Sequence, residues 1–228
     1  MVSQQQTATP ATSTEEPDLH PSPVDAVVFD LGNVLIDWDP QPAIAAGVGE
    51  ERAREFLTSG EFDFGAWNHA QDAGRTFADG EQEATATYPH LAEEIRSYRQ
   101  NFAKSLRGAI EGTVGILKHL HAAGIPLIAL TNWSAETFPI AVDTFDFLDL
   151  FEDIIVSGEE GVAKPDPEIF EELADRVRHL GGLDDCIFID DKLANVQAAI
   201  DAGMDAIAFT NPEDLRADLL VRGLPVGQ

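Results

Sequence analysis

The sequence predicts an α/β fold: a doubly wound parallel sheet with a Rossmann-like core and an inserted helical cap. After residue 110, short apolar runs alternate with segments of helical periodicity, which is typical of a parallel sheet whose crossover helices cover both faces. Between residues 42 and 106 the periodicity is mainly helical and no strand-like alternation persists, which indicates a helical module inserted after the first strand. The chain of 228 residues is also long enough to bury a core.

These observations divide the chain into three expected parts. They are a disordered polar tail at 1–23, an α/β core at 24–40 and 108–228, and a helical cap at 41–107. We expect disorder in the tail because it is rich in Ser, Thr, Gln, Pro and Glu and has little to bury. The tail also lacks the basic and apolar regions of a secretory signal.

The first strand is expected at 26–29, an apolar run of β-branched and aromatic residues that stops at Asp30. Gly32 and Asn33 follow, and both tolerate a tight turn. Apolar residues at helical spacing predict cap helices at 43–57, 76–88 and 91–106. In the core we expect strands at 125–130, 152–156, 186–189 and 205–209, and helices at 111–123, 135–147, 167–180, 193–202 and 212–221.

The composition excludes several classes of partner. A net charge of −27 argues against nucleic acid and against anionic membrane surfaces, because both would repel this protein. No run approaches the ~20 apolar residues that a membrane-spanning helix needs. The single cysteine, Cys186, lies in an apolar run, which favours a buried side chain and a reducing cytoplasm.

Polar side chains end three of the expected strands, and a lysine follows a fourth. They are Asp30, Thr131 with Asn132, Asp190 with Asp191, and Lys164. Right-handed crossovers place the carboxyl ends of parallel strands on one edge, where open α/β sheets bind their ligands. Taken singly, each has an ordinary alternative explanation: Thr131 and Asn132 as a turn, Lys164 as a solvated charge, and the Asp190–Asp191 pair as a helix cap.

The charges of this group predict a magnesium ion. Asp30, Asp190 and Asp191 bring three negative charges together and Lys164 brings one positive charge, so the carboxylates repel one another unless a cation joins them. Hard oxygen ligands without His or Cys favour Mg²⁺ over zinc. None of the six histidines shows a metal-ligand spacing.

A magnesium site of this kind suits a phosphate dianion. Lys164 would offset its charge, and Thr131 and Asn132 would donate hydrogen bonds to its oxygens. In-line phosphoryl transfer needs mainly positioning and electrostatic stabilisation. A carboxylate can serve as the nucleophile, which gives an aspartyl-phosphate that water hydrolyses.

Four segments in chain order resemble the motifs of the haloacid dehalogenase superfamily. They are Phe29-Asp-Leu-Gly-Asn-Val, Leu130-Thr-Asn-Trp-Ser, Ala163-Lys-Pro-Asp-Pro and Phe188-Ile-Asp-Asp-Lys-Leu-Ala-Asn195. The helical insertion between the first two resembles that family's cap. The Asp-Leu-Gly-Asn-Val variant most resembles the subgroup of sugar-phosphate phosphatases that includes α-D-glucose-1-phosphate phosphatase.

The resemblance implies an Mg²⁺-dependent phosphatase that hydrolyses a small phosphorylated metabolite, a sugar phosphate, through an aspartyl-phosphate. It implies that Asp30 is the nucleophile and also contacts the metal. It gives Asp191 as a direct metal ligand, with help from Asp190 and from the backbone carbonyl of Gly32. It assigns Thr131, Asn132 and Lys164 to the phosphoryl group and Asn195 to support of the fourth motif.

Gly32 departs from the family pattern. The family's usual phosphatases carry a second Asp two residues after the nucleophile, as general acid for the leaving group, and such help is typically worth ~10²–10⁴-fold in rate. Either another group acts, with Asp37 and Asp39 as the nearby candidates, or the leaving group needs little protonation. An anomeric sugar phosphate has such a leaving group, and Gly32 fits that class of substrate as a hypothesis.

Two other functions are compatible with the same residues. A 2-haloacid dehalogenase would use Asp30 to displace halide without a metal, but it would leave Asp190 and Asp191 uncompensated beside an anionic substrate. A non-catalytic regulatory protein would keep the fold alone, but it has no need to gather Asp30, Lys164 and Asp191 at one place.

The cap is expected to set substrate specificity. Its least regular segment contains Phe62, Phe64, Trp67, Asn68, Asp72 and Arg75. Asn68 or Arg75 is a candidate for contact with a sugar or a second anion, whereas the aromatic residues are at least as compatible with the interior of the cap. We predict no catalytic role for any of them.

Overall fold

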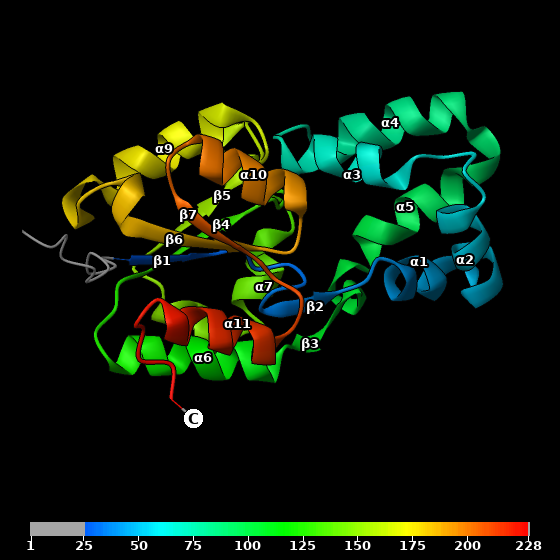
Figure 1. Ribbon diagram of the computed structural model, residues 1–228. Coiled ribbons are helices and arrows are strands. Elements are labelled where there is room, and N and C mark those ends of the chain that lie inside the picture. The colour runs from blue at the N-terminus through cyan, green and yellow to red at the C-terminus, as the bar shows by residue number, and fades with distance from the viewer. Residues whose placement is uncertain (1–25, 228) are drawn as a thin grey trace, which may run out of the picture.

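The computed structural model describes residues 26–227, which form a sheet with its helices and a group of further helices beside it (Figure 1). The tail expected at 1–23 lies outside these residues. Within residues 26–227, no helix combines the length and the apolar character that crossing a membrane requires.

A five-stranded parallel sheet forms the centre of the described core. Its order is β5 (Asp153–Val156), β4 (Leu127–Thr131), β1 (Ala26–Phe29), β6 (Cys186–Asp190) and β7 (Asp205–Ala208), and each neighbouring pair is parallel. The predicted fold class is confirmed. In the central strand β1, Val28 lies opposite Ile128 of β4 and Phe188 of β6. Asp30, the residue after β1, therefore lies at the middle of the edge where such sheets bind ligands.

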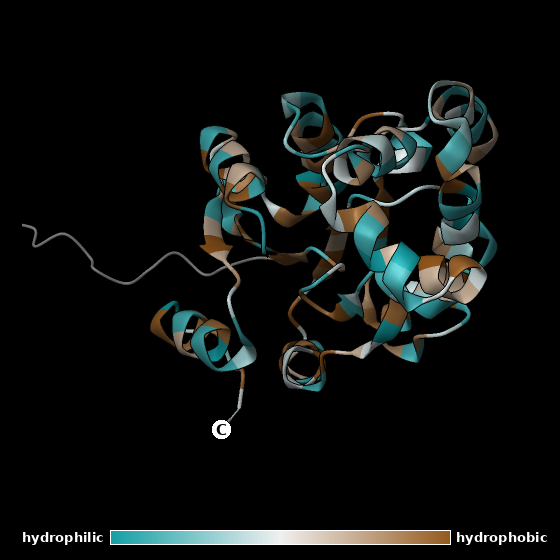
Figure 2. Cartoon of the chain, turned by 90° about the vertical axis from the view of Figure 1, so that its right-hand side faces the viewer, coloured by the Kyte–Doolittle hydropathy of each residue, from teal (hydrophilic) through white to brown (hydrophobic). Residues whose placement is uncertain are grey.

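Helices cover both faces of the sheet. In Figure 1, α9 (Pro167–Val177) and α10 (Leu193–Asp201) lie above it, and α6 (Glu111–Ala122) and α11 (Pro212–Val221) lie below it. Successive strand residues point to opposite faces. Val28 accordingly packs in a cluster with Phe170 of α9, whereas Phe29 belongs to the cluster that contains Leu117 of α6 and Leu219 of α11. Figure 2 shows the hydrophobic strands at the centre and mixed hydropathy on the helices.

The other core elements are short, and one of them corrects the sequence analysis. They are α7 (Phe138–Val142), α8 (Ser157–Glu160) and the 3₁₀ segments η3 (Asp146–Leu150), η4 (Arg178–Leu180) and η5 (Leu183–Asp185). The helix predicted over 135–147 is wrong outside α7. Pro139 confines the helix start to its own first turn, and Asp143 and Thr144 are weak helix formers, so the chain leaves the helix there.

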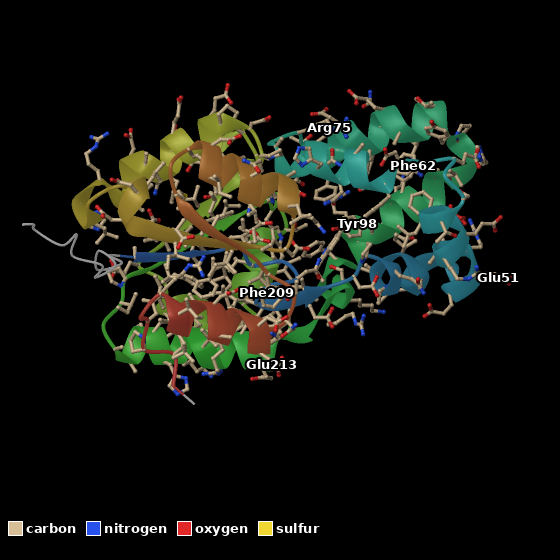
Figure 3. The ribbon with its side chains drawn as sticks, in the orientation of Figure 1. Glu51, Phe62, Arg75, Tyr98, Phe209 and Glu213 are labelled. Carbon is tan, nitrogen blue, oxygen red and sulfur yellow. The ribbon has the colours of Figure 1, made fainter. Side chains whose placement is uncertain are left out.

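Five helices stand between β2 (Ile36–Trp38) and β3 (Leu106–Ala109). They are α1 (Gln41–Val48), α2 (Glu50–Thr58), α3 (Phe64–Asp72), α4 (Phe77–Thr87) and α5 (Ala92–Gln100), with the 3₁₀ segments η1 (Pro89–Leu91) and η2 (Phe102–Ser105) beside α5. Rings from this region pack together, such as Phe62, which lies between α2 and α3, with Trp67, and Phe64 with Tyr98. Figure 3 shows Tyr98 between this group and the sheet.

Three details of this region differ from the predictions. The single helix expected over 43–57 breaks at Gly49, whose φ of 87° separates α1 from α2. The helix expected over 91–106 ends at Gln100. β3 then pairs antiparallel with β2, a ribbon that the sequence analysis missed. Strands of three and four residues are too short to show a periodicity, and their pairing joins residues about 70 positions apart in the chain.

Candidate active site

A cavity of about 390 Å³ opens at the carboxyl ends of β1, β4 and β6. The core lines it with Asp30, Asn132, Lys164 and Asp191, and the helices between β2 and β3 contribute Asp72 and Tyr98. Gly32 and Asn195 also line it. Thr131 and Asp190 are fully buried at the ends of their strands. Residues from four distant segments thus meet at one place.

Lys164 is the centre of the polar network. Its side chain is 1% exposed, and its Nζ donates to Asp30 Oδ1 at 2.9 Å, to Asp190 Oδ2 at 2.8 Å and to the carbonyl oxygen of Leu130 at 2.6 Å. These three acceptors use all three protons of the ammonium group. A solvated surface charge, the ordinary alternative for this lysine, does not describe it.

Asp190 is held by hydrogen bonds on both oxygens. Its Oδ1 accepts from the backbone N–H of Lys192 at 2.8 Å, and Asn195 Nδ2 lies 3.0 Å from each of the two oxygens. With Lys164 on Oδ2, the buried carboxylate is well supplied with donors. Asp190 and Asn195 therefore fix the position of the Lys164 ammonium beside Asp30.

Asn132 fastens the loop that carries Lys164. Its Nδ2 donates to the carbonyl oxygen of Lys164 at 2.8 Å, and its Oδ1 accepts from the Lys164 backbone N–H at 2.9 Å. Both ends of the amide are thus engaged in joining the loop to the end of β4. The Thr131 hydroxyl, in contrast, is buried and has no hydrogen-bond partner among the described residues.

Burial and neighbouring charges shift the pKa values of the central pair. Burial raises the pKa of Asp30 to about 7. Lys164 opposes this shift, while the charges of Asp190 and Asp191 add to it. Burial alone would lower the pKa of Lys164, but Asp30 and Asp190 outweigh burial and raise this pKa above its ordinary value. The environment thus favours the charged form of Lys164 and disfavours the charged form of Asp30.

The donor set suits a hard divalent cation. Asp30, Asp190 and Asp191 each offer a carboxylate oxygen, and these oxygens lie within 4.8 Å of one another. Asp191 forms a 2.9 Å ion pair with Lys192, whose side chain is largely exposed. Oxygen ligands with an excess of negative charge are those that Mg²⁺ selects.

The part of the site that comes from outside the core was named in the sequence analysis only as a candidate for substrate contact through Asn68 or Arg75, and no role was predicted for Asp72. Asn68 and Asp72 of α3 line the cavity, and Asn68 Nδ2 donates to Asp72 Oδ2 at 2.9 Å. Their spacing of four residues on a helix was the available signal. Phe62, Phe64 and Trp67 are buried among other rings, and Arg75 pairs with Glu83 at 2.9 Å.

The family model of the haloacid dehalogenase-like hydrolases matches residues 24–203. The chain belongs to this family. It has the fold of a hydrolase of the haloacid dehalogenase type, and the family that the resemblance indicated is confirmed.

Two similar proteins are named as phosphatases and a third as a flavin mononucleotide hydrolase. Sesquiterpene phosphatase astK of Aspergillus oryzae is 27% identical over 82% of this chain and 90% of its own length. Flavin mononucleotide hydrolase 1 of Arabidopsis thaliana is 30% identical over 78% of this chain and 58% of its own length. The 6-phosphogluconate phosphatase of Escherichia coli is 27% identical over 49% of this chain and 50% of its own length.

Solved structures share the fold. A haloacid dehalogenase family enzyme from Bacteroides thetaiotaomicron, in complex with magnesium, has a TM-score of 0.64 at 21% identity and covers 86% of this chain and 98% of its own. YfnB of Bacillus subtilis, bound to magnesium, has a TM-score of 0.63 at 17% identity and covers 86% of this chain and 99% of its own.

Proposed function

We propose that this protein is a Mg²⁺-dependent phosphatase that hydrolyses a small phosphate monoester through an aspartyl-phosphate on Asp30. The observation that carries the proposal is the contact of Asp30 with the buried ammonium of Lys164, beside a cluster of carboxylates and in the lining of the cavity. The relatives named as phosphatases or as a flavin mononucleotide hydrolase support phosphate-ester hydrolysis.

The proposed reaction has two steps. A carboxylate oxygen of Asp30 attacks phosphorus, and the bond from phosphorus to the alcohol oxygen breaks as that oxygen takes up a proton. Water then attacks the phosphorus of the aspartyl-phosphate and loses a proton, which releases inorganic phosphate and restores the carboxylate. Lys164 and the unpartnered hydroxyl of Thr131 are suited to hold the phosphoryl oxygens in both steps.

The ion would be held by Asp30, Asp191 and the backbone carbonyl of Gly32, and it would offset the negative charge of the phosphoryl group. Asp190 would assist from below, since its own oxygens are engaged by Lys164 and Asn195. We assign Asn132 to the support of Lys164 in addition to the phosphoryl contact that the resemblance implies, because both ends of its amide bind the Lys164 backbone.

For the substrate we keep the sugar phosphates as the proposed class. The cavity combines aromatic rings, such as Trp38 and Tyr98, with polar side chains such as Asn68, and sugars use both kinds of contact. We assign the helical segment 41–107 as the cap that closes over this substrate. The buried position of Cys186 in β6 agrees with the proposed cytoplasmic location.

A panel of phosphate esters tests the proposal. We expect the wild type to release phosphate with Mg²⁺ and to lose this activity in EDTA, and we expect Asp30→Asn to be inactive with an unchanged circular dichroism spectrum. Comparable turnover by Asp30→Asn would place the nucleophile elsewhere. Chloride release from 2-chloropropionate without Mg²⁺ would favour the dehalogenase instead.

A further inference from the structure

The proposed reaction needs a proton at the leaving oxygen, and position 32 cannot supply it. A Cβ added at Gly32 would meet no atom of residues 26–227 within 4 Å apart from its chain neighbours, so the space beside Gly32 is open. The nearby candidates Asp37 and Asp39 face Arg107, at 3.5 and 3.4 Å. Neither of them is among the described residues that line the cavity.

Asp72 is the carboxyl group that the cap brings to this cavity. It is the last residue of α3 and lines the same space as Asp30. Its backbone carbonyl accepts a 2.5 Å hydrogen bond from Ser157 Oγ, and Ser157 Oγ accepts from the backbone N–H of Trp133 in turn. The end of α3 is therefore fastened to the part of the core that follows Thr131.

The close approach of two backbones holds this junction together. A Cβ added at Gly74, two residues after Asp72, would lie 3.0 Å from the Cα of Gly161 in the core. Asn68, one turn earlier on α3, donates to Asp72 Oδ2 at 2.9 Å and orients the carboxyl group. Asp72 is thus held at a fixed place in the lining of the cavity that also contains Asp30.

The surroundings of Asp72 favour its protonated form. Burial raises its pKa to about 8, the backbone N–H of Ser134 lowers it, and the negative charge of Asp30 raises it further. Tyr98 of α5 faces it, and burial and the charge of Asp72 raise the pKa of this phenol well above its ordinary value. The other titratable groups that line the cavity are His69, Lys164, Asp191 and Lys192.

We propose that Asp72 is the general acid of this enzyme and donates its proton from the cap to the oxygen of the departing alcohol. This inference rests on the proposed phosphatase function. When Asp30 attacks phosphorus and the bond to the alcohol oxygen breaks, the carboxyl proton of Asp72 passes to that oxygen. The alcohol leaves neutral and Asp72 is left as a carboxylate. In the second step the carboxylate recovers a proton from the attacking water.

Substrates that differ in their leaving group test this role. p-Nitrophenyl phosphate releases a stable anion and needs little acid, whereas glucose 6-phosphate and glycerol 2-phosphate release alkoxides and need it. For Asp72→Asn we expect kcat/KM to fall by about 10²–10⁴-fold on the two alkyl esters and by only a few-fold on p-nitrophenyl phosphate. Because kcat/KM reports the steps through alcohol release, the common hydrolysis of the aspartyl-phosphate does not mask the difference.

The pH profile gives a second readout. In the wild type, kcat/KM on an alkyl ester should fall above about pH 8 as Asp72 loses its proton. This alkaline limb should be absent for p-nitrophenyl phosphate and absent in Asp72→Asn. Asp37→Asn is the matched control and should change neither profile, since Asp37 pairs with Arg107 outside the cavity.

Rescue separates proton donation from a structural role. Gly32 has room for a side chain, and Gly32→Asp would place an acid two residues after the nucleophile. On alkyl esters, adding Gly32→Asp to Asp72→Asn should raise kcat/KM at least tenfold above that of Asp72→Asn alone. Equal losses on all substrates, or wild-type rates of Asp72→Asn on alkyl esters, would overturn the inference. A wild type that hydrolyses no ester in the panel would overturn the phosphatase itself.

Discussion

Replacing Lys164 by methionine should destabilise the protein strongly at neutral pH. Lys164 is 1% exposed and pairs with two buried carboxylates at 2.9 and 2.8 Å, so Lys164→Met leaves Asp30 and Asp190 without this cation. Removing one partner of a buried ion pair typically costs about 3–5 kcal/mol. For a chain of this size, a loss of that order lowers Tm by roughly 6–20 °C.

The loss of stability in Lys164→Met should be smaller at acidic pH. An unpaired carboxylate can escape the penalty by taking up a proton, which for an ordinary aspartate costs roughly 4 kcal/mol at pH 7 and roughly 1.5 kcal/mol at pH 5. The difference in Tm between wild type and Lys164→Met should therefore be more than halved at pH 5. Below neutral pH the folded state of Lys164→Met holds protons that its unfolded state has released, so acidification stabilises the folded state of the variant.

Thermal unfolding followed by circular dichroism measures both effects, with EDTA present so that no metal compensates. Lys192→Met is the matched control, because that side chain is 66% exposed and pairs with Asp191 alone, an interaction worth at most about 1 kcal/mol. If Lys164→Met melts within about 2 °C of wild type at pH 7, or if its deficit does not shrink at pH 5, the electrostatic argument for this site fails.

Three further outcomes follow from the structure. Asp191→Asn should raise the Mg²⁺ concentration needed for half-maximal phosphate release by at least tenfold, and an unchanged Mg²⁺ titration would exclude Asp191 as a ligand. The stability of the wild type should fall as pH rises from about 4 to 8, because the pKa of Asp72 is 3.8 in the unfolded state and about 8 in the folded state, so that only the folded state holds this proton in the window. Asp72→Asn should therefore flatten the curve of Tm against pH, and parallel curves for the two proteins would contradict this. Phe77 is 1% exposed and packs against the rings of Trp67 and Tyr98. Phe77→Ala should lower the free energy of unfolding, measured by urea titration, by about 3–5 kcal/mol. A loss below about 1 kcal/mol would mean that these helices do not share one packed interior.

The core of the site could be predicted from sequence because its residues stand at strand ends. Asp30, Thr131 and Asp190 each come directly after or at the end of a buried apolar run, and parallel strands bring such ends to one edge whatever the loops do. Lys164 was predicted from the same logic, through the loop after β5. The chain order of strands and helices was enough for this part.

The hydrogen-bond partners of individual polar atoms could not be predicted from the sequence. Asn132 was predicted as a phosphate donor, and in the structure both ends of its amide bind the backbone of Lys164. Asp190 was predicted to assist a metal, and its oxygens accept from Lys164 and Asn195. Which acceptor each donor chooses depends on distances of a few ångströms, and no spacing in a sequence contains them.

The sequence by itself determined the parallel sheet, the helical insertion and the acids and lysine at the sheet's edge, because these depend on periodicity and on chain order. Only the tertiary structure decided that Asp72 enters the site while Asp37 and Asp39 face Arg107. Asp72 is more than 40 residues away in the chain from Asp30, and its spacing of four residues from Asn68 on α3 does not reveal what lies around it. Its environment arises where the end of α3 packs against Ser157 and Gly161, and that packing exists only in three dimensions.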